Sequence, residues 1–234
     1  MAPALERRGF LAAFTERTGG LSEAPFDSLN LGLHTGDGER TVRHNRRLAA
    51  AALGVRGLTA ARQVHGARMV EVHGPANGSL GDADALVTRL PWTPLAVMTA
   101  DCVPVVLAAD SLVTVVHAGW RGLAAGIVGR AALVLSEPKA AAAAIGPAIG
   151  PCHYEVGREV IEAVERGAGV PAVTRREGTR VFLDLAGTVE SVLRSVGIGE
   201  IDRAEECTAC DERRFFSHRR DGRTGRHAMV AVRM

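Results

Sequence analysis

The side chains with the greatest potential for catalysis or metal binding lie in two short strings, one with a thiol and the other with an imidazole. The first is Thr99-Ala100-Asp101-Cys102, and the second is His117-Ala118-Gly119-Trp120-Arg121-Gly122. A thiolate and an imidazole are ligands that zinc prefers, and they also form nucleophile–base pairs in covalent catalysis. Either chemistry requires Cys102 and His117 to meet in space.

The stretch between the two strings predicts how they meet. It consists of two apolar runs with Asp110-Ser111 between them, and a two-residue turn there would pair Pro104 with His117 and Cys102 with Gly119. Because residues two apart share one face of a strand, Cys102 and His117 would be diagonal neighbours with α-carbons roughly 7–8 Å apart. Pro104 cannot donate to a central ladder, so it predicts a sheet edge or a bulge that shifts this register.

A metal site would need a third ligand, and the residues alone leave its identity open. His65 lies in Gln63-Val64-His65-Gly66, and His73 follows in a similar His-Gly step. Spacing does not distinguish between these two histidines. The alternatives to a metal are a Cys102 nucleophile with His117 as its base, or a buried, inert cysteine beside a histidine that backbone bonds satisfy.

Short apolar runs and amphipathic stretches predict the elements that would position these residues. Gly54 ends one expected helix, and Gly66 turns one expected hairpin. Strands and helices are mixed and hairpins intervene, which favours a mixed sheet over a doubly wound parallel one. We expect strands at 10–14, 61–65, 69–72, 95–98, 103–108, 113–116, 141–145 and 227–232, and helices at 41–53, 123–135, 155–165 and 185–196.

The composition is that of a soluble globular protein with a single domain over residues 1–234. Apolar residues make up 47% of the sequence and charged residues 23%. The net charge of +2 does not require nucleic acid or an anionic membrane as a partner, and no apolar run approaches the ~20 residues that span a bilayer. Residues 1–14 lack the apolar core and cleavage site of a signal peptide. We therefore expect a cytoplasmic protein, monomeric or weakly self-associating, whose four cysteines stay reduced.

Two further features are expected to be structural. Cys207-Thr208-Ala209-Cys210 has Cys-x-x-Cys spacing, but a redox motif or zinc knuckle would need a helix start or a second ligand pair, so we interpret these thiols as structural. A basic cluster near the C-terminus lacks an aromatic stacking pattern, which indicates a solvated face or pairing with Glu205-Glu206 rather than nucleic-acid binding. Its members are Arg213, Arg214, Arg219, Arg220, Arg223 and Arg226.

Several strings, taken in order, resemble the YfiH-type laccase-domain family, also called polyphenol-oxidase-like proteins. The most specific are Gln63-Val64-His65-Gly66, Ala100-Asp101-Cys102 and His117-Ala118-Gly119-Trp120-Arg121-Gly122. The resemblance runs from about residue 10 to the C-terminus, and it also includes Leu29-Asn30-Leu31-Gly32, Asn45-Arg46, Asp82-Ala83-Asp84-Ala85-Leu86-Val87-Thr88, Ile145-Gly146-Pro147, Tyr154-Glu155-Val156-Gly157, Asp184-Leu185, Cys207-Thr208 and Phe216-Ser217-His218-Arg219-Arg220.

This resemblance implies a mixed α/β fold (α+β) in four layers, α/β/β/α, and one zinc ion held by His65, Cys102 and His117. It thereby selects His65 over His73. Three protein ligands leave one position of zinc open, and a water there has a pKa of about 7, which suits deamination. Copper is the less expected metal, because the chain has none of the His-x-His pairs typical of multicopper oxidases.

The resemblance further implies activity on purine nucleosides, with these nucleosides and phosphate as the partners. The reactions are phosphorolysis of inosine, guanosine, adenosine and methylthioadenosine, and deamination of adenosine. Arg46 and Arg121 are the expected oxyanion donors, with Asn30 as a further substrate-binding residue. Asp101 is the candidate general acid or base beside the metal ligands, and Asp84 is its alternative.

Three other functions compete with this hypothesis. A copper-dependent phenol oxidase would take up oxygen and contain copper. An amide hydrolase that edits peptidoglycan precursors would cleave a precursor carrying serine in place of alanine. A non-enzymatic partner in a larger metabolic assembly would associate tightly without turning over any purine.

Overall fold

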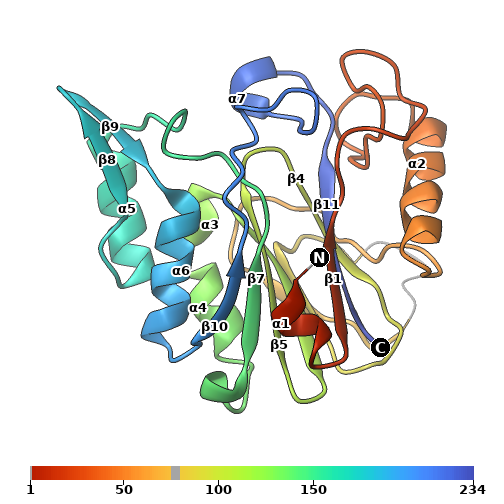
Figure 1. Ribbon diagram of the computed structural model, residues 1–234, viewed down its shortest axis with the longest axis horizontal. Coiled ribbons are helices and arrows are strands. Elements are labelled where there is room, and N and C mark those ends of the chain that lie inside the picture. Colours follow the sequence, from red (N-terminus) through yellow and green to blue (C-terminus); the bar gives the residue numbers. More distant parts are fainter. Residues whose placement is uncertain (1, 75–79) are drawn as a thin grey trace.

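Two β-sheets pack face to face, and helices cover the outer face of each, so the layers follow the order α/β/β/α (Figure 1). This computed structural model describes residues 2–74 and 80–234. The expected mixed α/β fold in four layers is therefore confirmed. Among the described residues, no helix is long and apolar enough to cross a membrane.

The larger sheet has parallel pairs at its two edges and antiparallel pairs in its centre. Its central strands are buried along their whole length. Because side chains alternate along a strand, Val113 and Val115 face the second sheet, whereas Leu112 and Val116 face the helices. Across the sheet, the strands are β10 (Glu200–Arg203), β7 (Ala142–Ile145), β5 (Val103–Ala109), β6 (Leu112–Ala118), β3 (Ala85–Thr88) and β2 (Met69–Glu71).

The smaller sheet is antiparallel, and each of its faces packs in a different apolar layer. Val97 belongs to the buried cluster between the sheets, together with Val106 of the larger sheet. On the opposite face, Val230 packs in a cluster with Ala49 of helix α2 (Glu39–Ala52). Across this sheet, the strands are β1 (Phe10–Phe14), β11 (His227–Arg233) and β4 (Leu95–Thr99).

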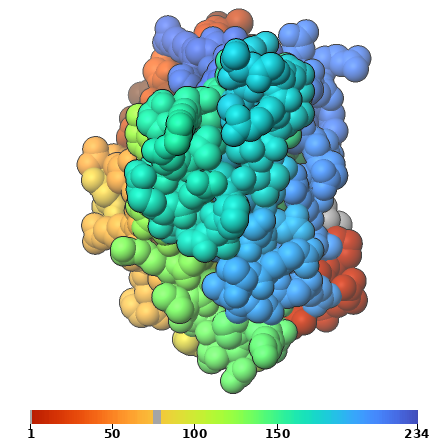
Figure 2. Space-filling view, turned by 90° about the vertical axis from the view of Figure 1, so that its left-hand side faces the viewer, coloured from red at the N-terminus to blue at the C-terminus, as the bar shows by residue number. Residues whose placement is uncertain are grey.

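The outer face of the larger sheet is covered by helices, whose green to blue surfaces face the viewer in Figure 2. Residues 123–135 do not form the single helix that the sequence predicts. Gly126 has a φ of 77° and divides the segment, and a Cβ there would lie only 3.2 Å from the carbonyl of Gly167. The covering helices are α3 (Trp120–Ala124), α4 (Ile127–Ala132), α5 (Arg158–Ala168) and α6 (Leu185–Ser195).

The hairpin predicted for residues 61–72 is wrong. Strand β2 pairs in parallel with β3, and the segment before it forms only an isolated bridge. The backbone amides of Val64, His65 and Gly66 instead donate to the carboxylate of Asp84, so the chain curls around a side chain that local sequence patterns do not reveal.

The elements that the sequence did not predict are the ribbon β8 (Thr174–Glu177) and β9 (Arg180–Leu183), strands β3 and β10, and the short helices α1 (Pro3–Glu6), α7 (His218–Asp221) and the 3₁₀ turn Pro138–Ala140.

The strand directions gather several loops at one edge of both sheets, the upper edge in Figure 1. The pairing places the starts of β2, β3, β5 and β11 at this edge, together with the ends of β4, β6, β7 and β10. The loops that carry the predicted functional residues therefore converge there.

Candidate metal centre

Three side chains that are distant in the sequence meet at this edge of the sheets. His65 precedes β2, Cys102 precedes β5, and His117 lies near the end of β6. One ligand atom of each, a sulfur or an imidazole nitrogen, lies within 4.8 Å of the other two. The centroids of the two imidazole rings are 4.8 Å apart. Two nitrogens and one sulfur form a donor set that suits zinc.

The β5–β6 hairpin brings Cys102 and His117 together in the register that the sequence predicts. Pro104 pairs with His117 in a continuous antiparallel ladder. The predicted bulge or sheet edge at Pro104 is wrong, because β7 begins to pair with β5 only at the next residue, Val105. Pro104 is therefore tolerated in a central strand at the point where the β5–β7 ladder ends.

Asp84 holds both histidines in place. Its fully buried carboxylate accepts hydrogen bonds from the backbone amides of Val64, His65 and Gly66 at 3.2, 2.9 and 2.8 Å. It also accepts a hydrogen bond from Nδ1 of His117 at 2.9 Å. With Nδ1 donating to a carboxylate, Nε2 of His117 keeps the lone pair that a metal requires. The structure thus gives Asp84 a positioning role that the sequence did not predict.

The structure places His65, and not His73, beside Cys102. Strand β2 begins after His65 and ends before His73, so the two imidazoles lie at opposite ends of that strand. His73 has a side chain that is 78% exposed. His65 has a φ of 60°, which is uncommon for a non-glycine residue. The hydrogen bond from its backbone amide to the carboxylate of Asp84 stabilises that conformation.

The ionised forms of Cys102 and His117 stabilise each other. Burial disfavours ionisation of the Cys102 thiol, but the charges and hydrogen bonds of His117 and His65 outweigh it and lower the pKa of Cys102. Burial also disfavours protonation of His117, yet Cys102 and the hydrogen bond to Asp84 raise its pKa. The site therefore favours a thiolate at Cys102, which is the form of cysteine that binds metals.

Gly119, which follows β6, provides the space into which these ligands project. A Cβ at this position would lie 2.9 Å from Sγ of Cys102 and 3.0 Å from Cδ2 of His65. Both distances are well below the 3.5–4.0 Å of a favourable carbon contact. A side chain of any size would consequently displace a ligand.

We expect Gly119→Ala to lower the zinc affinity by at least about tenfold, since the geometry of a metal site is sensitive to small displacements of its ligands. The affinity is measured by competition with a chromophoric chelator. Gly129→Ala is the matched control, because a Cβ at that position in α4 meets nothing within 4 Å. Equal zinc affinities for the two variants would contradict the prediction.

Asp101 anchors the loop that carries Cys102. Its φ is 88°, and its buried carboxylate accepts hydrogen bonds from Oγ1 of Thr208 at 2.7 Å and from the amide of Arg219 at 2.6 Å. Its carbonyl accepts a third hydrogen bond from the amide of Ile149 at 2.9 Å. Both carboxylate oxygens are thus engaged with the protein.

Two half-buried arginines contact Leu31, Arg46 through its guanidinium and Arg226 through its backbone carbonyl. Nε of Arg46 donates to the Leu31 carbonyl at 2.8 Å, and the carbonyl of Arg226 accepts from the Leu31 amide at 3.0 Å. Burial lowers the pKa of Arg46 to about 10. It also lowers the pKa of Arg226, although the nearby negative charges of Cys102 and Asp101 oppose this shift. In the described part of the chain, neither guanidinium forms an ion pair with a carboxylate.

The C-terminal arginines were expected on a solvated face or paired with Glu205-Glu206. Arg214 does lie 3.6 Å from Glu206, but for Arg226 the expectation is wrong, because its side chain is half-buried and pairs with neither glutamate in the described chain. Asn30 is buried, and its Oδ1 accepts a hydrogen bond from the amide of Arg226 at 2.9 Å. The Nδ2 group of Asn30 donates to two other side chains. Arg121 is exposed, and its guanidinium lies 4.4 Å from the centre of the Trp120 ring.

A surface cavity of about 690 Å³ lies away from the three ligands. Its lining combines three arginines with three acidic residues, and it includes none of His65, Cys102 and His117. We assign the functional site from the chemistry of the three ligands rather than from this cavity, which is lined by Arg17, Thr18, Pro25, Asp27, Ser28, Glu212, Arg213, Asp221 and Arg223.

The chain is similar to proteins of one family over nearly its whole length. The family described as multi-copper polyphenol oxidoreductase laccase matches residues 11–234. A purine nucleoside phosphorylase of Mycobacterium tuberculosis strain H37Rv is 40% identical over 224 residues, which cover 92% of this chain and 89% of the relative. Purine nucleoside phosphorylase YfiH of Escherichia coli K12 is 38% identical over 226 residues, covering 94% and 93%.

Solved structures show the same arrangement of layers. The crystal structure of YlmD from Geobacillus stearothermophilus superposes with a TM-score of 0.92 at 36% identity, covering 99% of this chain and 94% of that one. The crystal structure of YfiH from Bacillus licheniformis gives a TM-score of 0.87 at 34% identity, covering 98% and 94%. The likeness extends over the larger sheet, the smaller sheet and both helical layers.

Proposed function

The chain belongs to the multi-copper polyphenol oxidoreductase laccase family, and we propose that it is a zinc-dependent purine nucleoside phosphorylase that also deaminates adenosine. The observation that carries this proposal is the convergence of His65, Cys102 and His117 at one edge of the two sheets. Relatives that are named purine nucleoside phosphorylases support nucleosides and phosphate as the substrates.

The residues of the site fit zinc. His65, Cys102 and His117 would hold the ion, and three ligands of this kind leave a position open, as in catalytic zinc sites. Gly119 keeps the space between the ligands free, and Asp84 presents His117 in the required tautomer. Zinc bound there would supply Lewis acidity.

In phosphorolysis, an oxygen of phosphate forms a bond to C1′ of the ribose while the bond from C1′ to the purine nitrogen breaks. The purine leaves with a proton, and the products are the free base and ribose 1-phosphate. Phosphate is an anion and therefore needs cationic donors in fixed positions. We assign this role to Arg46 and Arg226, which have no carboxylate partner in the described chain, and to Arg121 from the solvent side.

Asn30 and Asp101 act through other residues in this proposal. Asn30 holds the backbone of Arg226, so it positions a phosphate donor. Asp101 uses both carboxylate oxygens to bind Thr208 and Arg219, so it positions the loop that carries Cys102. For deamination, His65, Cys102 and His117 would hold the same zinc ion, which would supply Lewis acidity for that reaction too.

We expect Arg46→Ala to raise the KM for phosphate by roughly 10–100-fold, because a hydrogen bond to a charged group contributes about 1.5–3 kcal/mol and each 1.4 kcal/mol is a factor of ten. The KM for the nucleoside and the zinc content should not change. Arg47→Ala, at the next and exposed position of α2, is the matched control. An unchanged KM for phosphate in Arg46→Ala would remove Arg46 from the phosphate site.

The proposed function is tested by incubating the purified, metal-assayed protein with adenosine, with and without phosphate. Liquid chromatography with mass spectrometry identifies the products. Adenine and ribose 1-phosphate that form only with phosphate would establish phosphorolysis, and inosine formed without phosphate would establish deamination. A folded, zinc-loaded sample that forms neither product would refute the proposal for adenosine. The serine-bearing peptidoglycan precursor would then be the next substrate.

The family description also names copper oxidation of phenols. The same preparation decides this alternative, because metal analysis reports copper directly and an oxygen electrode reports turnover of a phenol. Copper in the purified protein together with oxygen uptake would favour the oxidase.

A further inference from the structure

A second group of metal-ligating side chains lies at the same edge of the molecule. Cys152 and His153 lie in the turn that follows β7, and Cys207 and Cys210 lie in the loop that follows β10. One ligand atom from each of the four residues lies within 4.8 Å of the others. None of these residues belongs to the centre formed by His65, Cys102 and His117. We propose that this group binds a second zinc ion with a structural role.

The distances within the group resemble the edges of a zinc tetrahedron. Bonds of about 2.3 Å to sulfur and 2.0–2.1 Å to nitrogen give edges of about 3.8 Å between two sulfurs and about 3.6 Å between sulfur and nitrogen. Nδ1 of His153 lies 3.3, 3.7 and 3.5 Å from Sγ of Cys152, Cys207 and Cys210. The sulfurs of Cys152 and Cys210 are 3.5 Å apart, whereas a disulfide requires about 2.05 Å.

The number of ligands distinguishes this group from the first centre. Three thiols and one imidazole complete a tetrahedron, and sites closed in this way are structural. The amide of Gly150 donates to Sγ of Cys207 at 3.1 Å, which is the kind of hydrogen bond that supports a ligating thiolate from outside the coordination shell. The Cys-x-x-Cys string therefore has the second ligand pair that the sequence alone did not reveal.

The second ion would join the two loops that hold Asp101. The loop after β7 donates the Ile149 amide to the carbonyl of Asp101. The loop after β10 donates the hydroxyl of Thr208 to its carboxylate. The two loops also bond directly, from the Thr208 amide to the carbonyl of Ala148 at 3.0 Å. A zinc ion between them would therefore support the segment that presents Cys102, without taking part in the reaction.

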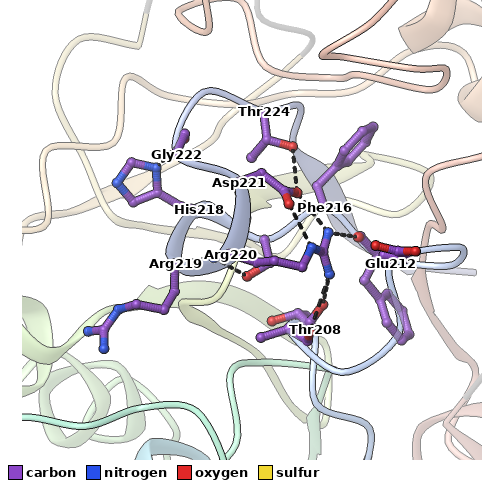
Figure 3. Close-up of polar contacts among 12 residues, drawn as sticks. Thr208, Glu212, Phe216, His218, Arg219, Arg220, Asp221, Gly222 and Thr224 are labelled. Carbon is purple, nitrogen blue, oxygen red and sulfur yellow. Dashed lines mark hydrogen bonds and ion pairs between the residues drawn. The ribbon is translucent and has the colours of Figure 1, made fainter.

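The loop after β10 continues into residues 208–221, in which Arg220 forms several hydrogen bonds within the segment. Figure 3 shows Arg220 between the carboxylate of Asp221 and the carbonyl of Thr208, with distances of 2.6 and 3.0 Å. The side chain of Arg219 points away from this network and donates to the carbonyl of Glu155 at 3.0 Å. The four ligands thus connect the loop after β7 to the hydrogen-bonded segment 208–221, which also donates to the carboxylate of Asp101.

Zinc content tests the proposal directly. The full-length protein, produced in zinc-containing medium and purified under reducing conditions, should contain about two zinc ions per chain by mass spectrometry of the metal. The double variant Cys152→Ser/Cys210→Ser should contain about one, and so should Cys102→Ser, which removes a ligand of the first centre. Combining all three substitutions should leave the protein without zinc. His73→Ala, an exposed histidine outside both groups, should leave the content unchanged.

The wild-type protein gives the total zinc content without any substitution, and the variants show which group holds each ion. About one zinc per chain, lost in Cys102→Ser and retained in Cys152→Ser/Cys210→Ser, would overturn it. A Cys152–Cys210 disulfide in the freshly purified protein, detected by non-reducing peptide mapping, would also overturn it.

Hydrogen exchange gives a second readout that is independent of catalysis. Loss of the second ion should speed amide exchange in residues 146–157 and 204–221, which the ion would join. Exchange in β5 and β6 should not change, because those strands are buried in the centre of the sheet. Unchanged exchange in both loops of Cys152→Ser/Cys210→Ser would exclude the structural role.

Discussion

The variant His117→Ala is expected to lose both phosphorolysis and deamination, with kcat/KM reduced by roughly 10³-fold or more. His117 is buried and would donate one of only three protein ligands to the metal. The Lewis acidity of a bound metal contributes several kcal/mol to transition-state stabilisation, and each 1.36 kcal/mol is a factor of ten in rate. Rates with inosine and phosphate, and with adenosine alone, measure the two reactions.

His73→Ala is the control for this experiment, because His73 lies at the far end of β2 and is exposed to solvent. It should retain both activities and the full zinc content. If His117→Ala kept either activity at the wild-type rate, that reaction would not depend on the metal centre. If it lost zinc but kept its fold, the loss of activity would be assigned to the site rather than to unfolding.

The second large effect is expected for Asp84→Asn. An amide nitrogen at either oxygen position would face donors, since one oxygen accepts from His65 and His117 and the other from Val64 and Gly66. We expect the free energy of unfolding to fall by roughly 3 kcal/mol, because buried donors lose their partner. The zinc affinity should fall by about 10–100-fold, as it does when other second-shell carboxylates are removed.

The matched control is Asp82→Asn, two residues earlier in the chain. Asp82 pairs with Arg62 at 2.5 Å in an exposed salt bridge, which contributes at most about 1 kcal/mol. Denaturant unfolding of the metal-free proteins and chelator competition measure the two quantities. Equal losses in Asp84→Asn and Asp82→Asn would mean that the buried carboxylate does not organise the site.

The stability contributed by Asp84 should also depend on pH. Although burial opposes ionisation, hydrogen bonds from His117 and the backbone lower the pKa of Asp84 in the folded protein. A lowered pKa means that this contribution is present above the unfolded pKa of about 3.9 and is lost as the pH falls through the folded value. Asp84→Asn should therefore remove part of the acid sensitivity of the wild-type protein.

The sequence by itself determined the parts of the site that depend on neighbouring residues. Cys102 directly precedes β5 and His117 lies in β6, and a two-residue turn joins these strands. Alternation along a strand and the turn length were therefore enough to predict their proximity. The strands near Phe10, Leu95 and His227 were also predicted from the sequence, because short apolar runs indicate strands that are buried in a sheet. The resemblance to a family then supplied the four layers and the choice of His65.

The tertiary structure decided what depends on contacts between distant segments. Only the folded chain shows that the carboxylate of Asp84 accepts hydrogen bonds from three backbone amides of the His65 loop. No pattern in the neighbouring sequence predicts these bonds, because nearly twenty residues separate Asp84 from the loop. Only the pairing of β7 with β10 brings Cys152 and His153 to Cys207 and Cys210, since more than fifty residues separate the two pairs. Local propensity indicates which secondary structure a segment prefers in isolation. These contacts depend instead on which strands are neighbours in the sheet.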